Sequence, residues 1–343
     1  MKKLLNTLYI TSEKKYLSLD GENVVVKEDN CEVGRLPLHN LDMIVTFSRL
    51  GVSPALLGKC AENGISLVFL KPNGSYLARV EGKTRGNVLL RKKQYRVSED
   101  ETESLEIAKN FILGKVYNGR WVIERMKRDH VLQVDVSKLQ KASEELQEGI
   151  HKVAECADID TLRGYEGKPA VSYFSVFDEM ILQQKEDFYF RERNRRPPLD
   201  NVNALLSFCY TLLANMTAAA LETVGLDPCV GFMHGERPGR YSLALDLMEE
   251  LRPALADRFV LRLINKRIVT AKDFTKKEDG AVLMSDDARK LVLSEWQKRK
   301  QEEIVHPYLK EKIQWGMVPH AQAMLLARYL RGDLDAYPPF FWK

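Results

Sequence analysis

The chain has 343 residues, of which 45% are hydrophobic and 29% are charged, a composition typical of a soluble protein that buries a core. This length favours two domains. The apolar runs are much shorter than the roughly 20 residues of a membrane span, and no cleavage site follows the amino-terminal lysines, so we expect a cytoplasmic protein without a membrane partner.

The cysteines and the basic residues narrow the class further. The five cysteines are scattered and show no CxxC spacing, which disfavours a disulfide framework and a zinc site and predicts reduced, mostly buried thiols. The formal net charge is +4, and basic residues gather in three runs, Lys83–Arg96, Arg191–Arg196 and Lys298–Lys300. One such run usually forms a solvated surface, whereas three of them indicate nucleic acid as a candidate partner.

The first 80 residues have the pattern of a small β domain. Gly21 in the sequence DGEN predicts a hairpin turn, and the sequence PNG at 72–74 predicts a second turn. One short helix is expected, with Ser53 as its N-cap, Pro54 at its first position and Gly64 at its end. Runs of β-branched and aromatic residues predict the strands Leu8–Thr11, Tyr16–Leu19, Val24–Lys27, Leu41–Phe47, Ile65–Lys71 and Tyr76–Val80.

The rest of the chain has apolar residues at helical spacing, with glycine and proline between the periodic segments. The predicted helices are Glu103–Arg128, Val136–Ala157, Asp178–Phe190, Asn203–Val224, Ser242–Leu251, Ala254–Asn265 and Asp286–Glu311. We therefore expect an α+β protein. A small N-terminal β-sandwich-like domain covers 1–82, a linker and domain junction covers 83–100, and a larger all-α catalytic domain covers 101–343.

A pair of acids in the segment SLALDLMEELRP is the first chemical signal. Asp246 and Glu249 are three residues apart on a predicted helix, so their carboxylates project from one face. Two like charges repel each other there, and a cation would relieve the repulsion. Glu250 fits the spacing as well, and a solvated acidic stripe is the ordinary alternative. Spacing therefore leaves the second acid open.

Two other segments offer residues that can complete a site. His234 lies in the glycine-flanked segment GFMHGERPGRYS, a predicted loop just before the helix of the acids. Glu166 lies between glycines in LRGYEGKPA, which we interpret as a constrained loop with basic neighbours. Imidazole plus carboxylates is a ligand set that suits Mn²⁺ and tolerates Mg²⁺. A metal in such a site can bind a phosphate oxygen and activate a water or a sugar hydroxyl.

Four strings resemble the signatures of the CRISPR adaptation integrase family, CRISPR-associated protein one. They are LRGYEG, RNRRPPLDNVNALLSFCYTLL, GFMHGERPGRYSLALDLMEELRP and LARYLRGDLDAYPPF, and they occur in the family's order. The pattern is most similar to the members of type I systems, subtype I-C. The resemblance implies that Glu166, His234 and Glu249 bind the metal, with Asp246 as a neighbouring catalytic acid. It thereby favours Glu249 over Glu250, at a position that is aspartate in some members.

The resemblance also implies an activity and an assembly. The expected enzyme is a Mg²⁺- or Mn²⁺-dependent DNA integrase and endonuclease, which joins the 3′-hydroxyl ends of a prespacer duplex to the CRISPR repeat by transesterification. Nuclease activity on branched DNA is expected from the same site. The expected partners are double-stranded DNA, a second copy joined through the β domains, and the small ferredoxin-like CRISPR-associated protein two, which completes a heterohexamer.

Several residues have open roles on sequence alone. Five cations near the predicted metal are candidates for phosphate contacts, namely Arg163, Lys168, Arg237, Arg240 and Arg252. His306 and His320 are expected to be structural, and the apolar tail at 337–342 is expected to dock on its own domain or on a partner. Two other function classes remain: a non-catalytic DNA-binding scaffold, and a phosphohydrolase of small nucleotides, which commonly uses denser histidine and aspartate clusters.

Overall fold

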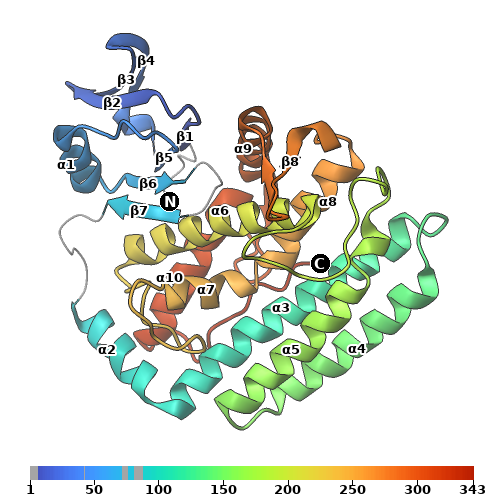
Figure 1. Cartoon of the computed structure of the whole chain (residues 1–343). Coiled ribbons are helices and arrows are strands. Elements are labelled where there is room, and N and C mark those ends of the chain that lie inside the picture. The colour runs from blue at the N-terminus through green and yellow to red at the C-terminus, as the bar shows by residue number, and fades with distance from the viewer. Residues whose placement is uncertain (1–6, 42, 72–75, 81–87) are drawn as a thin grey trace. The chain divides into compact units, whose positions relative to one another are not determined.

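The computed structural model describes residues 7–41, 43–71, 76–80 and 88–343, and the chain divides into two compact units (Figure 1). The N-terminal unit comprises residues 1–85 together with 284–302, and the helical unit comprises residues 86–283 together with 303–343. The first division lies close to the predicted end of the β domain at residue 82. Strands dominate the first unit and helices the second, which confirms the α+β class.

Two sheets form the N-terminal unit. The larger sheet has the strand order β1 (Thr7–Ile10), β5 (Met43–Thr46), β6 (Ser66–Leu70) and β7 (Tyr76–Val80), with only the β6–β7 pair antiparallel. The smaller, antiparallel sheet consists of β2 (Lys15–Asp20), β3 (Asn23–Glu28) and β4 (Cys31–Pro37). Leu17 and Val24 of the smaller sheet share one core with Ile44 and Leu67 of the larger one. This shared core is the predicted sandwich-like arrangement.

Local signals in the N-terminal unit are confirmed where the structure describes them. Gly21 has φ 57° in the turn between β2 and β3. Helix α1 (Pro54–Asn63) begins after Ser53, whose hydroxyl accepts a hydrogen bond from the backbone N of Leu56, and it ends at Gly64, with φ 68°. Strand β4 was not predicted, because its largely exposed residues have no alternating apolar pattern. The predicted turn at 72–74 lies outside the described residues.

Helix α9 (Asp286–Gln301) belongs to the N-terminal unit, although it lies far along the chain in the range assigned to the helical domain. The Lys300 ammonium donates a hydrogen bond to the Thr7 hydroxyl at 2.9 Å, and the Arg289 guanidinium lies 5.5 Å from the centre of the Phe47 ring. The predicted helix to residue 311 is wrong beyond Gln301. A short strand follows, and Pro307 disfavours helical backbone at the residue before it.

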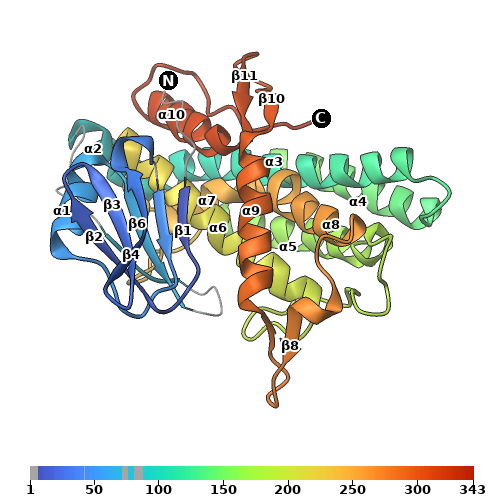
Figure 2. The same cartoon turned by 90° about the horizontal axis from the view of Figure 1, so that it is seen from above.

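The helical unit contains most of the chain. Helices α3, α4 and α5 run alongside one another in both views, and α6 packs against α7 and α10 (Figures 1 and 2). The helices are α2 (Val88–Glu99), α3 (Glu101–Asp129), α4 (Val136–Ala154), α5 (Ile159–Ser175), α6 (Asn201–Val224), α7 (Ser242–Glu249), α8 (Arg258–Asn265) and α10 (Val318–Leu330). A π-helical turn over Arg252–Asp257 joins α7 to α8. The short strands are β8 (Phe274–Lys276), β9 (Val282–Met284), β10 (Glu303–Val305) and β11 (Lys312–Gln314).

Three segments differ from the sequence-based expectation. Helix α2 occupies residues assigned to the linker, and α5 occupies the segment interpreted as a loop around Glu166. The glycines of α5 lower its helix propensity, but the Asp158 cap and packing against α3 and α4 outweigh that cost. The predicted helix over 178–190 is wrong beyond its first turn. Side chains hold the backbone there: Asp178 accepts a hydrogen bond from the Phe190 N, and Gln184 donates to the Ile264 carbonyl.

Helix α6 is the one helix in the described residues that has the length and composition to cross a membrane, with a mean hydropathy of 1.6 over its most apolar window. Of that window, 67% is buried inside the structure. The helix therefore has the character of a core helix, whose apolar surface is covered by α7 and α10. The sequence analysis did not single it out, because polar residues interrupt its apolar runs.

All five cysteines are free thiols, in agreement with the prediction. Cys60, Cys156 and Cys209 are buried, whereas Cys31 and Cys229 are exposed. Burial raises the pKa of the Cys60 thiol to about 11, so this residue is protonated and unreactive at neutral pH.

The C-terminal tail docks on the helical unit, and the buried carboxylate of Glu250 holds it. That carboxylate accepts hydrogen bonds from the Tyr337 hydroxyl at 2.5 Å, the Gln322 amide at 2.9 Å and the Phe340 backbone N at 2.7 Å. The side-chain amide of Asn118 donates to the Phe340 carbonyl and accepts from the backbone N of Trp342. The apolar tail is therefore part of the core of its own domain.

A glycine makes the close packing of α4 on α5 possible. A Cβ atom at Gly149 would lie 2.7 Å from Cγ of Pro169, whereas a Cβ at Gly164 would meet nothing within 4 Å. We predict that Gly149→Ala lowers the free energy of unfolding by about 1–3 kcal/mol through overpacking. The control Gly164→Ala should raise it by up to about 1 kcal/mol through helix propensity. Denaturant unfolding measures both, and equal effects of the two variants would contradict the assigned contact.

The stability of the tail anchor should depend on pH. Burial raises the pKa of Glu250 to about 7, although the hydrogen bonds from Tyr337, Phe340 and Gln322 lower it. The native state then binds this proton more tightly than the unfolded chain does. The contribution of Glu250 to the free energy of unfolding is therefore full below about pH 4.5 and falls as the pH rises to about 7. Glu250→Gln cannot titrate, so its melting temperature in metal-free buffer should fall less than that of the wild type between pH 5 and pH 7.

Candidate active site

Three helices and one loop of the helical unit bring the candidate residues together. Helix α3 supplies Lys115, α5 supplies Glu166 and α7 supplies Glu249, while the loop before α7 supplies His234. Lys115 is paired with both glutamates, and Asp246 of α7 holds the ring of His234. Glu166 and Glu249, distant in sequence, therefore meet at one ammonium, and His234 is held against the helix that carries Glu249.

Asp246 holds the histidine loop in place. This fully buried carboxylate accepts hydrogen bonds from the backbone N of Phe232 at 2.7 Å, of Met233 at 3.0 Å and of His234 at 3.0 Å. Its Oδ1 also lies 2.5 Å from Nδ1 of the His234 ring. Gly231 is required beside it, since a Cβ there would lie 2.7 Å from the Asp246 carboxylate. Asp246 is thus a positioning residue that engages Nδ1 and leaves Nε2 of His234 as the nitrogen for a ligand.

Glu249 is a buried carboxylate between two cations. Its side chain is 4% exposed, with Oε1 at 2.7 Å from the Arg252 guanidinium and Oε2 at 2.9 Å from the Lys115 ammonium. Burial by itself would raise the pKa of this carboxyl group, but the charges of Arg252 and Lys115 outweigh it and lower the pKa to about 2. Glu249 is therefore ionised at every physiological pH.

Glu166 projects from the middle of α5 toward the same ammonium. Its Oε1 is paired with the Lys115 Nζ, and its side chain is 27% exposed. Glu166 is thus the more accessible of the two carboxylates that flank Lys115. The constrained loop, which was one reason for choosing this residue, is wrong, because Glu166 stands on helix α5.

Glu249 and Glu250, which helical spacing alone could not separate, have different partners. Glu249 contacts Lys115 and Arg252, whereas Glu250 contacts the C-terminal tail. A Cβ at Gly114 would lie 2.7 Å from the Cβ of Glu250, so α3 approaches this acid closely. Of these two acids, only Glu249 contacts the residues of the candidate site, and its role as a metal ligand stays a prediction.

The donor set of the candidate site fits a divalent cation. Glu249 Oε2 is buried and accepts no hydrogen bond, although the Lys115 charge lies beside it. Two carboxylates and an imidazole whose Nδ1 is fixed by a buried aspartate are ligands of the kind that Mn²⁺ and Mg²⁺ accept. Across the described residues, however, no three His, Cys, Asp or Glu side chains are gathered as a ready-made metal site. Lys115, a residue that the sequence analysis missed, lies between the two glutamates.

A sequence signal for Lys115 does exist. It follows Phe111 by four residues and precedes Gly119 by four, so a lysine stands on a stripe of α3 whose other members are buried. Charged residues on such a stripe require a buried partner. The partners, Glu166 and Glu249, lie 51 and 134 positions away, and the sequence offers no means of choosing them.

A cavity of about 380 Å³ adjoins the paired charges. Lys115, Glu166 and Arg252 line it together with aromatic residues of α5 and α6, among them Tyr173 and Tyr210. The Arg252 guanidinium lies 5.0 Å from the centre of the Tyr210 ring. The cavity thus combines positive charge with aromatic faces, a combination that suits a nucleotide.

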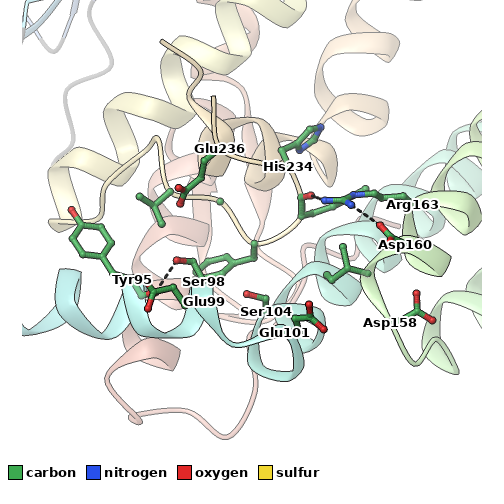
Figure 3. A pocket seen from close by; sticks show the side chains of 16 residues that line it. Tyr95, Ser98, Glu99, Glu101, Ser104, Asp158, Asp160, Arg163, His234 and Glu236 are labelled. Atoms are coloured by element: carbon green, nitrogen blue, oxygen red, sulfur yellow. Dashed lines mark hydrogen bonds and ion pairs between the residues drawn. The ribbon is translucent and has the colours of Figure 1, made fainter. Parts of the chain in front are cut away.

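A second cavity, of about 720 Å³, lies on another side of the histidine loop (Figure 3). His234 and Arg163 line it together with a set of carboxylates, namely Glu99, Glu101, Asp158, Asp160 and Glu236. Figure 3 shows the pairing of Arg163 with Asp160 at its rim. Five carboxylates repel phosphate, so this cavity is a poor site for a DNA backbone.

The predicted phosphate contacts have different surroundings. Arg252 is bound to Glu249, and Arg163 is bound to Asp160 and to the Met233 carbonyl, where it braces the histidine loop. Lys168 and Arg237 are exposed, and Arg240 is half-buried.

The three basic runs also contribute fewer exposed charges than their sequences suggest. Arg193 donates to the side chains of Asn203 and Ser207, and Lys300 is buried. Residues 83–87 of the first run lie outside the described residues. Of the two histidines that were expected to be structural, His306 is buried, and its ring is hydrogen-bonded to Gln322.

Comparisons with known proteins show which family the chain resembles. The family described as "CRISPR associated protein Cas1" matches residues 8–298. The chain is 49% identical over 343 residues to CRISPR-associated endonuclease Cas1 1 of Chlorobaculum tepidum, and 52% identical over 347 residues to CRISPR-associated endonuclease Cas1 2 of Rhodospirillum rubrum. Both alignments cover 100% of each protein.

Solved structures share the fold. A casposase bound to its integration product has a TM-score of 0.84 and 23% identity, with coverage of 98% of this chain and 93% of the casposase. A Cas1 protein from Thermotoga maritima has a TM-score of 0.82 and 21% identity, with coverage of 97% and 99%. At these identities the likeness shows the fold, while the sequence relatives show the family. The chain belongs to the Cas1 family of CRISPR-associated endonucleases.

Proposed function

We propose that this protein is a divalent-metal-dependent DNA integrase and endonuclease of CRISPR adaptation, which joins prespacer 3′-hydroxyl ends to the CRISPR repeat by transesterification. The observation that carries the proposal is the buried carboxylate of Glu249, which shares the Lys115 ammonium with Glu166 beside a cavity that Lys115 and Arg252 line. Asp246, on the same helix as Glu249, holds the ring of His234. A surface role does not account for a glutamate that is 4% exposed and ionised. The non-catalytic scaffold therefore leaves the burial of this charged carboxylate unexplained.

The residues divide the chemical work. Glu166, Glu249 and Nε2 of His234 would hold Mg²⁺ or Mn²⁺, which supplies charge stabilisation at the scissile phosphate and lowers the pKa of an attacking hydroxyl or water. Asp246 keeps Nε2 of His234 available, because it engages Nδ1. Arg252 stays bound to Glu249 and maintains that carboxylate in its charged form. With a DNA 3′-hydroxyl as the nucleophile the product is joined DNA, and with water it is cut DNA.

The partners follow from the same activity. Double-stranded DNA, both as prespacer and as CRISPR repeat, is the substrate that we propose, with phosphates near Lys168, Arg237 and Arg240. We extend the proposal to a homodimer and to a heterohexamer with the companion protein Cas2, in the cytoplasm. A solved Cas6-RT-Cas1–Cas2 complex contains a chain with the same fold, at a TM-score of 0.83 and 23% identity, of which this chain covers 36%.

The proposed ligands can be tested one at a time. Glu166→Ala, His234→Ala and Glu249→Ala should each lower Mn²⁺- or Mg²⁺-dependent cleavage of a branched duplex, and strand transfer into a repeat-bearing plasmid, by at least about 100-fold, because each removes a ligand. Duplex binding should persist. Glu148→Ala is the control, since this exposed acid of α4 is paired with Lys152 and lines neither of the two cavities beside the candidate residues. If a variant with all three substitutions still catalysed strand transfer, the assignment of the metal ligands would be wrong.

Asp246 offers a separate test of positioning. Asp246→Asn replaces an acceptor with a donor beside the His234 ring and the three backbone N–H groups of the loop. We expect about a 10- to 100-fold loss of metal affinity or turnover, as for other residues that orient a histidine ligand. Titration calorimetry with Mn²⁺ measures the affinity, and thermal unfolding shows whether the variant is folded. Unchanged affinity in a folded variant would mean that the aspartate does not orient His234.

A further inference from the structure

Lys115 lies where a cation would be expected. Its ammonium is paired with Glu166 Oε1 and lies 2.9 Å from Glu249 Oε2, so one positive charge bridges the two proposed carboxylate ligands. Arg252 pairs with the other oxygen of Glu249. Two carboxylates thus face two cations, and the charges of this inner network already balance.

A divalent cation placed between these carboxylates would make the balanced network doubly positive. Repulsion between the cation and the Lys115 ammonium would be strong, because the side chain of Lys115 is 15% exposed and little water screens it. The carboxylate oxygens have lone pairs for both cations, but the two cations repel each other when they are held against the same two carboxylates. Either the lysine withdraws or the site receives further negative charge.

The structure provides room for the withdrawal. Lys115 lines the cavity of about 380 Å³ together with Glu166 and Arg252. The lysine side chain is a flexible stem of four carbons, so its ammonium can turn from the carboxylates into this space while α3 stays in place. In the cavity a negative partner would compensate the ammonium charge, and a DNA phosphate is the partner that the proposed function supplies.

We propose that Lys115 is a built-in counter-ion that couples metal binding to DNA binding. In the DNA-free protein it neutralises Glu166 and Glu249 and keeps the affinity for divalent cations low. A phosphate that enters the cavity draws the ammonium away and adds negative charge, so the metal binds tightly only with DNA. By thermodynamic linkage the metal strengthens DNA binding by the same factor. This inference rests on the proposed function, because it assumes that Glu166 and Glu249 are metal ligands.

The closest alternative is a permanent ion pair that serves only stability. In that case Lys115 stays between the glutamates whether or not DNA is bound, and its removal leaves two uncompensated carboxylates. Both cases predict a less stable metal-free protein for a neutral variant. They differ in metal affinity, since only a competing counter-ion weakens it in a DNA-dependent way.

The test is Mn²⁺ binding by the full-length protein, measured by titration calorimetry with and without an unbranched duplex that ends in 3′-dideoxynucleotides. Wild type should bind Mn²⁺ at least about 10-fold more tightly with the duplex than without it, within the usual range of coupling. Lys115→Met keeps the length of the stem and removes the charge. It should bind Mn²⁺ at least about 10-fold more tightly than the DNA-free wild type, with a smaller further gain from DNA.

Two further variants keep the result interpretable. Lys109→Met is the matched control, because Lys109 lies on the same helix, is 16% exposed and is paired with Glu106. It should leave Mn²⁺ affinity and its dependence on DNA as in the wild type. Lys115→Arg keeps the charge, so it should retain weak Mn²⁺ binding without DNA. If the methionine variant does not fold, the arginine variant and the comparison of the wild type with and without the duplex carry the test.

Each outcome decides a specific point. The counter-ion role is overturned, and the proposed function stands, if the wild type cuts DNA and binds Mn²⁺ while the Mn²⁺ affinity of the variants does not follow the charge at position 115. Such a result is a Lys115→Met variant that, without DNA, binds Mn²⁺ no more tightly than the wild type, or a Lys115→Arg variant that binds it more tightly. Equal Mn²⁺ affinity of the wild type with and without the duplex overturns the counter-ion role as well. If wild type neither cuts DNA nor binds Mn²⁺ with the duplex present, the proposed function itself fails.

Discussion

The burial of Glu249 between Lys115 and Arg252 is the interaction on which the rest of the site depends. A carboxylate that is 4% exposed is tolerated only because two cations compensate it. Removal of one partner of such a buried pair typically costs about 3–5 kcal/mol. Helices α3 and α7 and the π-helical turn must therefore keep their mutual positions, and the cavity beside them keeps its charged rim.

Three acids at the C-terminal end of α7 show how one short helix serves three purposes. Asp246 binds the loop of His234, Glu249 enters the charged network, and Glu250 anchors the C-terminal tail. Spacing alone would place them near one face of the helix, so the different partners follow from what packs around each acid. The same segment thus connects the candidate site to the core: the tail and Asn118 fasten α7 to α3, and α3 carries Lys115.

Much of the fold follows from local pattern, and the failures have identifiable causes. The helix around Asn203 and the cap at Ser53 were predictable, because apolar spacing and capping chemistry act over a few residues. The helix around Glu166 was missed because its glycines lower the local propensity, while its stability comes from α3 and α4. Residues 178–190 have helical periodicity but are held irregular by the hydrogen bond that Asp178 accepts from the Phe190 N and the one that Gln184 donates to the Ile264 carbonyl. The N-terminal packing of α9 depends on Thr7 and Phe47, almost 300 and 240 positions before their partners.

The sequence by itself determined the two-part α+β organisation and, through family strings, the choice of Glu166, His234 and Glu249. Hydrophobic periodicity and short motifs are local properties, so they survive in the one-dimensional chain. Only the tertiary structure decided that Asp246 holds the histidine, that Glu250 belongs to the tail, and that Lys115 lies between the glutamates. Those roles are set by which charges and donors are buried together, and burial is a property of the packed chain that no residue carries alone.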